Sequence, residues 1–229
     1  MSQPINLDRL TEVGVVAVIR APSTQAALRG AEALVRGGIT GLEITYSTPD
    51  APAVIAALDE EFGDAIYLGA GTVTRPDQAR EAADAGALFL VSPGTMAPVV
   101  EAMLATGRVV LPGALTPSEV MQCVTLGAHV VKIFPASIGG PGLLRALKGP
   151  FPQIPMMPTG GVSADNLADW FVAGAIAVGA GSELVSTPEL AAADWDVITG
   201  KARRFAAALA AARAAVSGRK AASAADTVR

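Results

Sequence analysis

The feature that most constrains the fold is a repeat of short apolar runs separated by helical segments that end in glycine. Eight runs rich in Val, Ile and Leu cover residues 13–19, 41–46, 65–73, 87–93, 108–115, 129–136, 154–160 and 175–181. The closing glycines recur at a spacing of about 20–25 residues, at Gly38, Gly63, Gly86, Gly107, Gly127, Gly149 and Gly174. Runs that are almost continuously apolar are typical of parallel strands covered on both faces, so the repeat indicates a series of βα units.

Eight such units predict an α/β fold of the (β/α)8 TIM-barrel type, with an extra C-terminal helix over 188–213. Trp195, Ile198 and Phe205 are the residues expected to dock this helix against the barrel. A doubly wound open sheet is the alternative, but no G-x-G-x-x-G turn follows the first run. Residues 1–213 are expected to form a single domain, and the small polar residues of 214–229 predict a disordered tail.

Composition excludes several classes of protein. The net charge of −4 gives no reason to expect a nucleic-acid partner. One cysteine, Cys123, excludes an internal disulfide framework, and one histidine, His129, excludes a histidine-rich metal cluster. Neither a signal peptide nor an apolar run long enough to span a bilayer is visible, so we expect a cytoplasmic protein that does not enter membranes.

The most unusual residue is Lys132, which lies within the apolar run "GAHVVKIFPAS" at 127–137. Strand alternation places it on the same face as Val130 and Phe134, opposite Val131 and Ile133. If Val131 and Ile133 pack against helices, Lys132 points into the barrel. Burial disfavours the charged form of an amine, which leaves it available as a nucleophile toward carbonyl carbon. The structural alternative is a lysine paired with a buried carboxylate, or one whose ammonium reaches the rim.

Glu43, in "GLEITY", alternates in the same way, because Leu42 and Ile44 occupy the opposite face. Schiff-base chemistry requires an amine and a separate proton shuttle, and it requires no metal and no cofactor. Glu43 is the candidate shuttle for Lys132, although a plain buried ion pair would satisfy the same pattern.

The last two runs predict a phosphate site. "PTGGVSADN" (158–166) carries Gly160 and Gly161 ahead of a helix expected to be capped by Ser163, and "VGAGSEL" (178–184) carries Gly181 and Ser182 at a short helix start. Loops after the seventh and eighth strands of such barrels bind phosphate through backbone N–H groups. Glycines used only for tight turns are the alternative explanation.

Two further loops supply small residues and hydroxyl groups. "GAGTV" (69–73) ends the third run and "VSPGT" (91–95) ends the fourth. Gly69 and Gly71 leave room at the barrel mouth, and Thr72 is placed to donate a hydrogen bond to a substrate carboxylate.

Taken in order, "LEIT", "GAGTV", "SPG", "VKIFPA", "PTGG" and "GS" resemble the 2-dehydro-3-deoxy-6-phosphogluconate / 4-hydroxy-2-oxoglutarate (KDPG/KHG) aldolase family. The resemblance covers about residues 10–185 and implies a metal-free class I aldolase that releases pyruvate and glyceraldehyde 3-phosphate from a 2-keto-3-deoxy sugar acid phosphate. It implies that Lys132 is the Schiff-base lysine and Glu43 the general acid/base. It also implies a homotrimer, and it assigns substrate binding to Thr72, Pro93, Phe134, Gly160, Gly161 and Ser182, with Gly181 in the same loop.

One position departs from the family. A well-known branch carries a substrate-binding arginine in an "LEVTLRT"-like loop, where this chain has Ser47 in "LEITYSTPDA". Arg20 ends the first strand in "AVIR" and is the candidate replacement. We expect it to contact the pyruvyl carboxylate or to lie beside it.

Four alternatives to the principal activity stay open. The substrate could be the C4 epimer, 2-dehydro-3-deoxy-6-phosphogalactonate, or unphosphorylated 4-hydroxy-2-oxoglutarate. A different phosphate-binding barrel, such as a sugar-phosphate isomerase or epimerase, would keep the glycine loops without using an imine. A non-catalytic barrel would serve as a scaffold or ligand sensor.

Overall fold

All strand pairs in the computed structural model, which describes residues 6–227, are parallel. A six-stranded sheet has the order β5-β4-β3-β2-β1-β9, and a three-stranded sheet has the order β6-β7-β8. The strands are β1 (Val15–Ile19), β2 (Gly41–Thr45), β3 (Tyr67–Gly71), β4 (Phe89–Val91), β5 (Val109–Leu111), β6 (Gly113–Ala114), β7 (Val131–Ile133), β8 (Met156–Pro158) and β9 (Val178–Ala180). Each predicted run therefore contains a strand, and the parallel α/β fold is confirmed.

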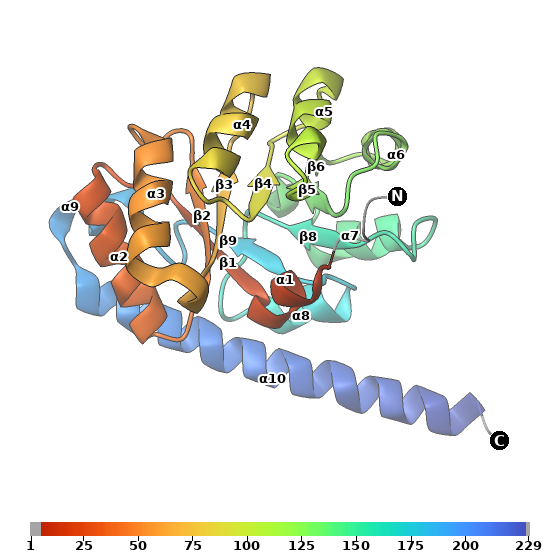
Figure 1. The fold of residues 1–229 in the computed structure, drawn as a ribbon. Helices are drawn as coiled ribbons and strands as arrows, with labels where there is room; N and C mark the ends of the chain where they lie inside the picture. The colour runs from red at the N-terminus through yellow and green to blue at the C-terminus, as the bar shows by residue number, and fades with distance from the viewer. Residues whose placement is uncertain (1–5, 228–229) are drawn as a thin grey trace.

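Helices follow the strands and cover their outer side (Figure 1). They are α1 (Asp8–Val13), α2 (Thr24–Arg36), α3 (Ala51–Phe62), α4 (Pro76–Asp84), α5 (Ala97–Ala105), α6 (Pro117–Thr125), α7 (Gly140–Lys148), α8 (Leu167–Val172), α9 (Thr187–Ala192) and α10 (Trp195–Thr227), with short 3-10 turns η1 (Gly63–Ala65) and η2 (Ala136–Ile138). Several of these helices begin with a side-chain cap. Ser23 Oγ accepts a hydrogen bond from Ala26 N at the start of α2, and Thr116 does the same for Glu119 N at α6.

Hydrogen bonds also connect the two sheets. The fifth run is divided at Pro112, which has no N–H to give to a ladder. On one side, Lys132 N donates to Pro112 O and Val130 N to Val110 O. On the other side, a parallel bridge joins Thr159 to Gly179, and Ile176 N donates to Met156 O.

The side chains separate into two apolar groups, as strand alternation predicts. Val131 and Ile133 of β7 belong to the larger group, which lies between the strands and the helices. Val130 belongs to a smaller group inside the strands, together with Val16, Phe89 and Met157. The strands therefore turn one face inward, and Lys132 lies on that face.

The C-terminal helix begins and ends later than predicted, because residues 188–192 belong to the separate helix α9, which ends at the left-handed Ala193. α10 runs along α2 and α8 (Figure 1), with Ile198 and Phe205 buried and Trp195 half-buried, as expected for its docking residues. It continues to Thr227, so residues 214–227 are helical where we expected a disordered tail. Alanine has the highest helix propensity and no proline interrupts this stretch, which favours extension of the helix. Residues 228–229 lie outside the described residues.

Within residues 6–227, no helix is both long enough and apolar enough to cross a membrane.

Candidate active site

Lys132 and Glu43 lie together inside the strands. Lys132 comes from β7 and Glu43 from β2, and Lys132 Nζ is 3.9 Å from Glu43 Oε1. The Lys132 side chain is 7% exposed and the Glu43 side chain is 0% exposed. An amine and a carboxylate from separate strands therefore share one dry position, as the sequence predicted.

The Glu43 carboxylate has unused hydrogen-bonding capacity. Neither Oε1 nor Oε2 accepts a hydrogen bond from the residues that the structure describes, although both oxygens are buried. A buried carboxylate usually fills this capacity. The ion pair to Lys132 is longer than a hydrogen bond, so Glu43 can still exchange a proton with a group placed beside the amine.

One glycine makes room for the Glu43 carboxylate, and a second allows the chain after β4 to lie close to the strand beside Lys132. A Cβ atom on Gly71 of β3 would overlap the Glu43 carboxylate. A Cβ atom on Gly113 of β6, which is paired with Lys132, would overlap the Pro93 carbonyl. Thr72 follows β3, which pairs with the strand of Glu43, and Pro93 follows β4, with its carbonyl against the glycine that is paired with Lys132.

Phe134 connects the lysine to a cavity at the ends of the strands. Lys132 Nζ is 4.9 Å from the centroid of the Phe134 ring, within the range of a cation–π contact. The ring also lines a cavity of about 140 Å³. The other residues that line this cavity are Val18, Arg20, Thr159, Gly160, Gly161, Val162, Gly181, Ser182 and Glu183.

The glycine loops that line this cavity carry backbone N–H groups that are not used within the described part of the protein. Gly160 and Gly161 have φ angles of 99° and 73°, a left-handed conformation that favours glycine. Among the described residues, no protein acceptor receives the N–H groups of Gly160, Gly161, Ser182 or Glu183. Unpaired N–H groups around a concave surface are suited to binding an anion.

Local structure in both loops differs from the sequence prediction. Residues 181–185 form a turn rather than a helix start, with Leu184 N and Val185 N both donating to Gly181 O. Asn166, not Ser163, precedes the first residue of α8. Ser163 instead closes the turn before the helix, since its Oγ accepts from Asn166 N and its N–H donates to Asn166 Oδ1. The predictions failed because short polar turns and helix caps use the same residues.

Arg20 lies at the cavity, on the side of the β9 loop. Its Nη1 is 3.7 Å from the position that a Cβ on Gly181 would occupy. Its backbone carbonyl accepts a hydrogen bond from Thr187 Oγ1, and the neighbouring Ala21 N donates to Thr48 Oγ1. Ser47, at the position of the family arginine, is exposed and hydrogen-bonds Thr45 Oγ1.

Six of the ten predicted site residues thus line one cavity: Arg20, Phe134, Gly160, Gly161, Gly181 and Ser182. Lys132 lies next to Phe134, and Glu43 lies next to Lys132. Thr72 and Pro93 do not line this cavity, and Pro93 instead borders a separate apolar pocket with Val73, Met96 and Val99.

Thr159 is a residue to which the sequence assigned no role. It directly follows β8, lines the cavity and is 6% exposed, and its Oγ1 is buried without a hydrogen-bond partner among the described residues. A Cβ on Gly179 would overlap this hydroxyl. Its position after a strand was the available signal, but contact with the cavity depends on the long-range pairing of β8 and β9.

Neither Cys123 nor His129 takes part in the site. Burial raises the pKa of the Cys123 thiol, which disfavours the reactive thiolate. Burial lowers the pKa of His129, whose Nδ1 accepts a hydrogen bond from Val110 N. Residues 6–227 contain no group of three His, Cys, Asp or Glu side chains that could hold a metal ion.

Comparisons with known proteins agree with this arrangement. A sequence model of the family described as "KDPG and KHG aldolase" matches residues 7–201. The KHG/KDPG aldolase of Escherichia coli (strain K12) is 40% identical over 195 residues, 85% of this chain and 91% of that protein. The 2-dehydro-3-deoxy-phosphogluconate aldolase of Treponema pallidum (strain Nichols) is 36% identical over 193 residues, 84% of this chain and 91% of that protein. The crystal structure of KDPG aldolase from Legionella pneumophila, with pyruvate captured as a covalent carbinolamine intermediate, superimposes with a TM-score of 0.78 at 34% identity, over 84% of this chain and 93% of that one.

Proposed function

Because this chain belongs to the KDPG and KHG aldolase family and is therefore a carbon–carbon lyase, we propose that it cleaves 2-dehydro-3-deoxy-6-phosphogluconate to pyruvate and glyceraldehyde 3-phosphate through an imine on Lys132. The observation that carries this proposal is the buried Lys132–Glu43 pair beside a cavity lined by the glycine loops and Arg20. The pair supplies the nucleophile and the proton shuttle, and the cavity supplies an anchor for phosphate.

The reaction follows from these positions. The neutral Lys132 amine adds to the C2 carbonyl of the substrate, and loss of water from the carbinolamine gives a protonated imine. Glu43 removes the proton of the C4 hydroxyl, the C3–C4 bond breaks, and its electron pair enters the imine to form an enamine. The aldehyde product leaves. Glu43 then returns the proton to C3, and water hydrolyses the imine to release pyruvate and the amine.

The remaining residues bind the substrate. The N–H groups of Gly160, Gly161 and the Gly181–Ser182 turn would hold the phosphate group. Arg20 would bind an anionic group, and its position beside Gly181 favours the phosphate over the pyruvyl carboxylate that the sequence suggested. Thr159 would hydrogen-bond a substrate oxygen between the two ends.

Thr72, Pro93 and Phe134 would form the pocket for the pyruvyl part of the substrate. Their contacts support this assignment. Thr72 follows the glycine that faces Glu43, the Pro93 carbonyl lies against the partner of Lys132, and the Phe134 ring lies beside the amine.

The direct test is incubation with pyruvate and borohydride, followed by peptide mass spectrometry. We expect a reduced pyruvyl adduct on Lys132 and none in Lys132→Ala. Glu43→Gln should lower kcat by about 100-fold or more while still forming some adduct, since the amine is intact. Absence of an adduct, or an adduct that survives Lys132→Ala, contradicts the mechanism.

Comparison of kcat/KM on three substrates identifies the natural one. These are the phosphogluconate-derived acid, its C4 epimer 2-dehydro-3-deoxy-6-phosphogalactonate, and unphosphorylated 4-hydroxy-2-oxoglutarate, which would yield pyruvate and glyoxylate. We expect the first to be preferred. A sugar-phosphate isomerase or a scaffold protein would release no pyruvate from any of them.

We also propose that the two sheets form one closed (β/α)8 barrel within a single domain over 1–213. The bridge from Thr159 to Gly179 and the bonds from Val130 and Lys132 to Val110 and Pro112 support closure on both sides. β5 and β6 then count as one strand.

A homotrimeric state in the cytoplasm remains a prediction from the family resemblance.

A further inference from the structure

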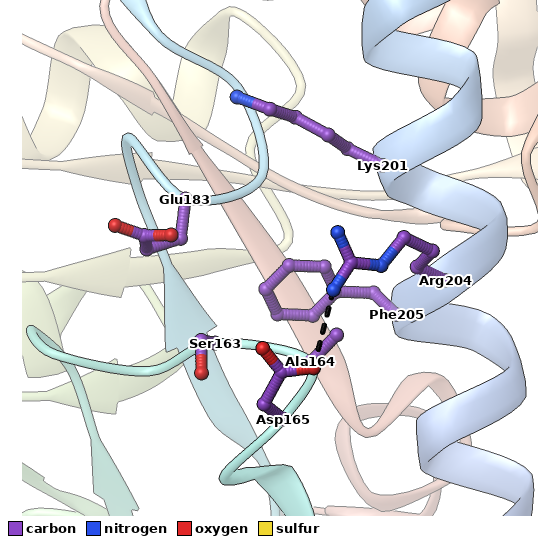
Figure 2. Close-up of a pocket in the computed structure, with 7 residues that line it drawn as sticks. All are labelled: Ser163, Ala164, Asp165, Glu183, Lys201, Arg204 and Phe205. Atoms are coloured by element: carbon purple, nitrogen blue, oxygen red, sulfur yellow. Dashed lines mark hydrogen bonds and ion pairs between the residues drawn. The ribbon is translucent and has the colours of Figure 1, made fainter.

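A lysine on α10 contacts the loop that follows β9, residues 181–186, on the side that faces this helix. Lys201, on α10, donates from Nζ to the backbone carbonyl of Ser182 at 3.4 Å and pairs with the Glu189 carboxylate. The Lys201 side chain is 29% exposed and that of Glu189 is 17% exposed, so this is a partly buried pair. Figure 2 shows Lys201 extending from α10 toward the loop that carries Glu183.

Glu189 connects the same lysine to the far end of the loop. Glu189 accepts a hydrogen bond from Ser186 N at 3.0 Å, within the capping box of α9. Burial raises the pKa of the Glu189 carboxyl, but the hydrogen bonds from Lys201 and Ser186 lower it by a larger amount. The pKa of Glu189 is therefore below its ordinary value. Lys201 and Glu189 therefore hold residues 182–189 at both ends.

The contact with the Ser182 carbonyl has a directional consequence. In a trans peptide the C=O and N–H groups point to opposite sides. The carbonyl of the Ser182–Glu183 peptide points toward Lys201, behind the loop. The Glu183 N–H of the same peptide therefore points away from Lys201. Glu183 lies between two hollows, since it lines the cavity of the glycine loops and also the pocket beside Lys201 and Arg204 that Figure 2 draws. This N–H has no acceptor among the residues that the structure describes.

We propose that Lys201 is a positioning residue that sets the affinity of the cavity for phosphate by holding the Ser182–Glu183 peptide with its N–H toward the ligand. The ammonium also polarises this peptide through its hydrogen bond to the Ser182 carbonyl. This inference rests on the proposed function, because the substrate that it concerns is the phosphorylated sugar acid. The binding of inorganic phosphate can be measured independently of catalysis.

Arg204, one turn farther along α10, is a weaker counterpart. It pairs with Asp165 in the loop after β8 at 3.1 Å (Figure 2), but the two side chains are 67% and 84% exposed. An ion pair this exposed contributes little. The test therefore concerns Lys201.

The first measurement is the dissociation constant of inorganic phosphate, by isothermal titration calorimetry, for the wild type and Lys201→Met. We expect the constant to rise about tenfold in Lys201→Met, the size of one hydrogen bond from a charged donor. Lys201→Arg should recover most of the affinity, because a guanidinium can donate to both partners. Arg203→Met is the matched control, since Arg203 is exposed on the same helix and makes no hydrogen bond or ion pair with the described residues.

The second measurement separates positioning from a general structural role. In Lys201→Met, KM for the phosphorylated substrate should rise by the same factor as the phosphate constant, while kcat stays within about twofold. Cleavage of unphosphorylated 4-hydroxy-2-oxoglutarate should not change. An equal loss on both substrates would mean general damage to the site and overturn the proposal.

The two hypotheses fail in different ways. If the wild type cleaves neither substrate, the proposed function fails, but a loss of phosphate affinity in Lys201→Met still supports the positioning role. Equal phosphate affinity in the two proteins, or no phosphate binding by the wild type, overturns the positioning role whatever the aldolase assay gives. If Lys201→Met does not fold, Glu189→Gln serves instead, and it should weaken phosphate binding by about threefold; unchanged affinity in that variant overturns the proposal.

Discussion

At the scale of single residues, one glycine makes room for the carboxylate of the buried Lys132–Glu43 pair. Gly71 lies in β3 opposite Thr45, and the Glu43 carboxylate occupies the space where a side chain at position 71 would begin. Gly71 and the Glu43 side chain are both buried, so the carboxylate could not avoid a side chain at position 71 by moving to solvent. The position of the Glu43 carboxylate relative to Lys132 therefore depends on the absence of a Cβ at residue 71.

We predict that Gly71→Ala lowers kcat by about 100-fold, the usual cost of misplacing a catalytic group by about 1 Å. The pyruvate adduct on Lys132 should still form, because the amine is not displaced. Steady-state kinetics and borohydride trapping measure the two effects. Gly200→Ala is the control, since a Cβ at Gly200 meets nothing within 4 Å, and it should leave kcat unchanged. If Gly71→Ala retains the wild-type kcat, catalysis does not depend on the space that Gly71 leaves for the Glu43 carboxylate.

At the scale of elements, the loops that follow the strands are held by helix caps. The loop from β6 to α6 is an example. One carboxylate oxygen of Glu119 accepts hydrogen bonds from Leu115 N at 2.9 Å and Thr116 N at 2.8 Å. These backbone hydrogen bonds lower the pKa of Glu119. The cap holds the chain just after Gly113, which is paired with Lys132.

We predict that Glu119→Gln lowers the free energy of unfolding by about 0.5–1 kcal/mol at pH 7, the range for a helix cap and a first-turn charge. Because the pKa of Glu119 is lower in the folded state, its contribution is present above the ordinary value of 4.5 and is lost as pH falls through the lowered folded value. The difference between wild type and variant should therefore shrink below pH 4.5. Urea unfolding at pH 7 and pH 3.5 measures it; a difference that is constant or grows on acidification contradicts the assignment.

At the scale of the whole molecule, the elements that follow β4, β6 and β7 each carry an exposed apolar side chain. Met96, which precedes α5, is 66% exposed, Met121 of α6 is 59% exposed and Ile138 of η2 is 69% exposed. Exposed apolar patches of this kind often mark contacts between subunits. They are the surface through which we expect the proposed trimer to assemble.

Light scattering should give a mass about three times the 23.1 kDa of one chain. The double variant Met96→Asp/Met121→Asp should shift the mass toward one chain, because it places charges in an apolar contact. Val197→Asp is the control, since Val197 is also exposed at 49% but lies on α10, far along the chain from these elements. A monomeric wild type, or an unchanged mass in the double variant, contradicts this surface.

Local patterns in the sequence were sufficient to predict the strands, their inward face and the placement of Lys132 and Glu43 on that face. Apolar runs locate parallel strands, and alternation within a strand assigns Lys132 and Glu43 to one face, because both depend only on neighbours a few residues away. The glycine loops were found for the same reason. Where local signals conflict, as at the turns of Ser163 and Ser182, the predicted helix starts were wrong.

Tertiary structure decided the rest. Gly71 borders Glu43, Arg20 lies beside Gly181, Thr159 faces the cavity and Lys201 reaches Ser182. Each of these contacts joins different elements, and all four depend on the pairing of strands or the docking of α10. The amino-acid sequence by itself determined which residues could do chemistry. Which of them meet was decided by packing, because a distance through space depends on the whole fold and not on the spacing of residues along the chain.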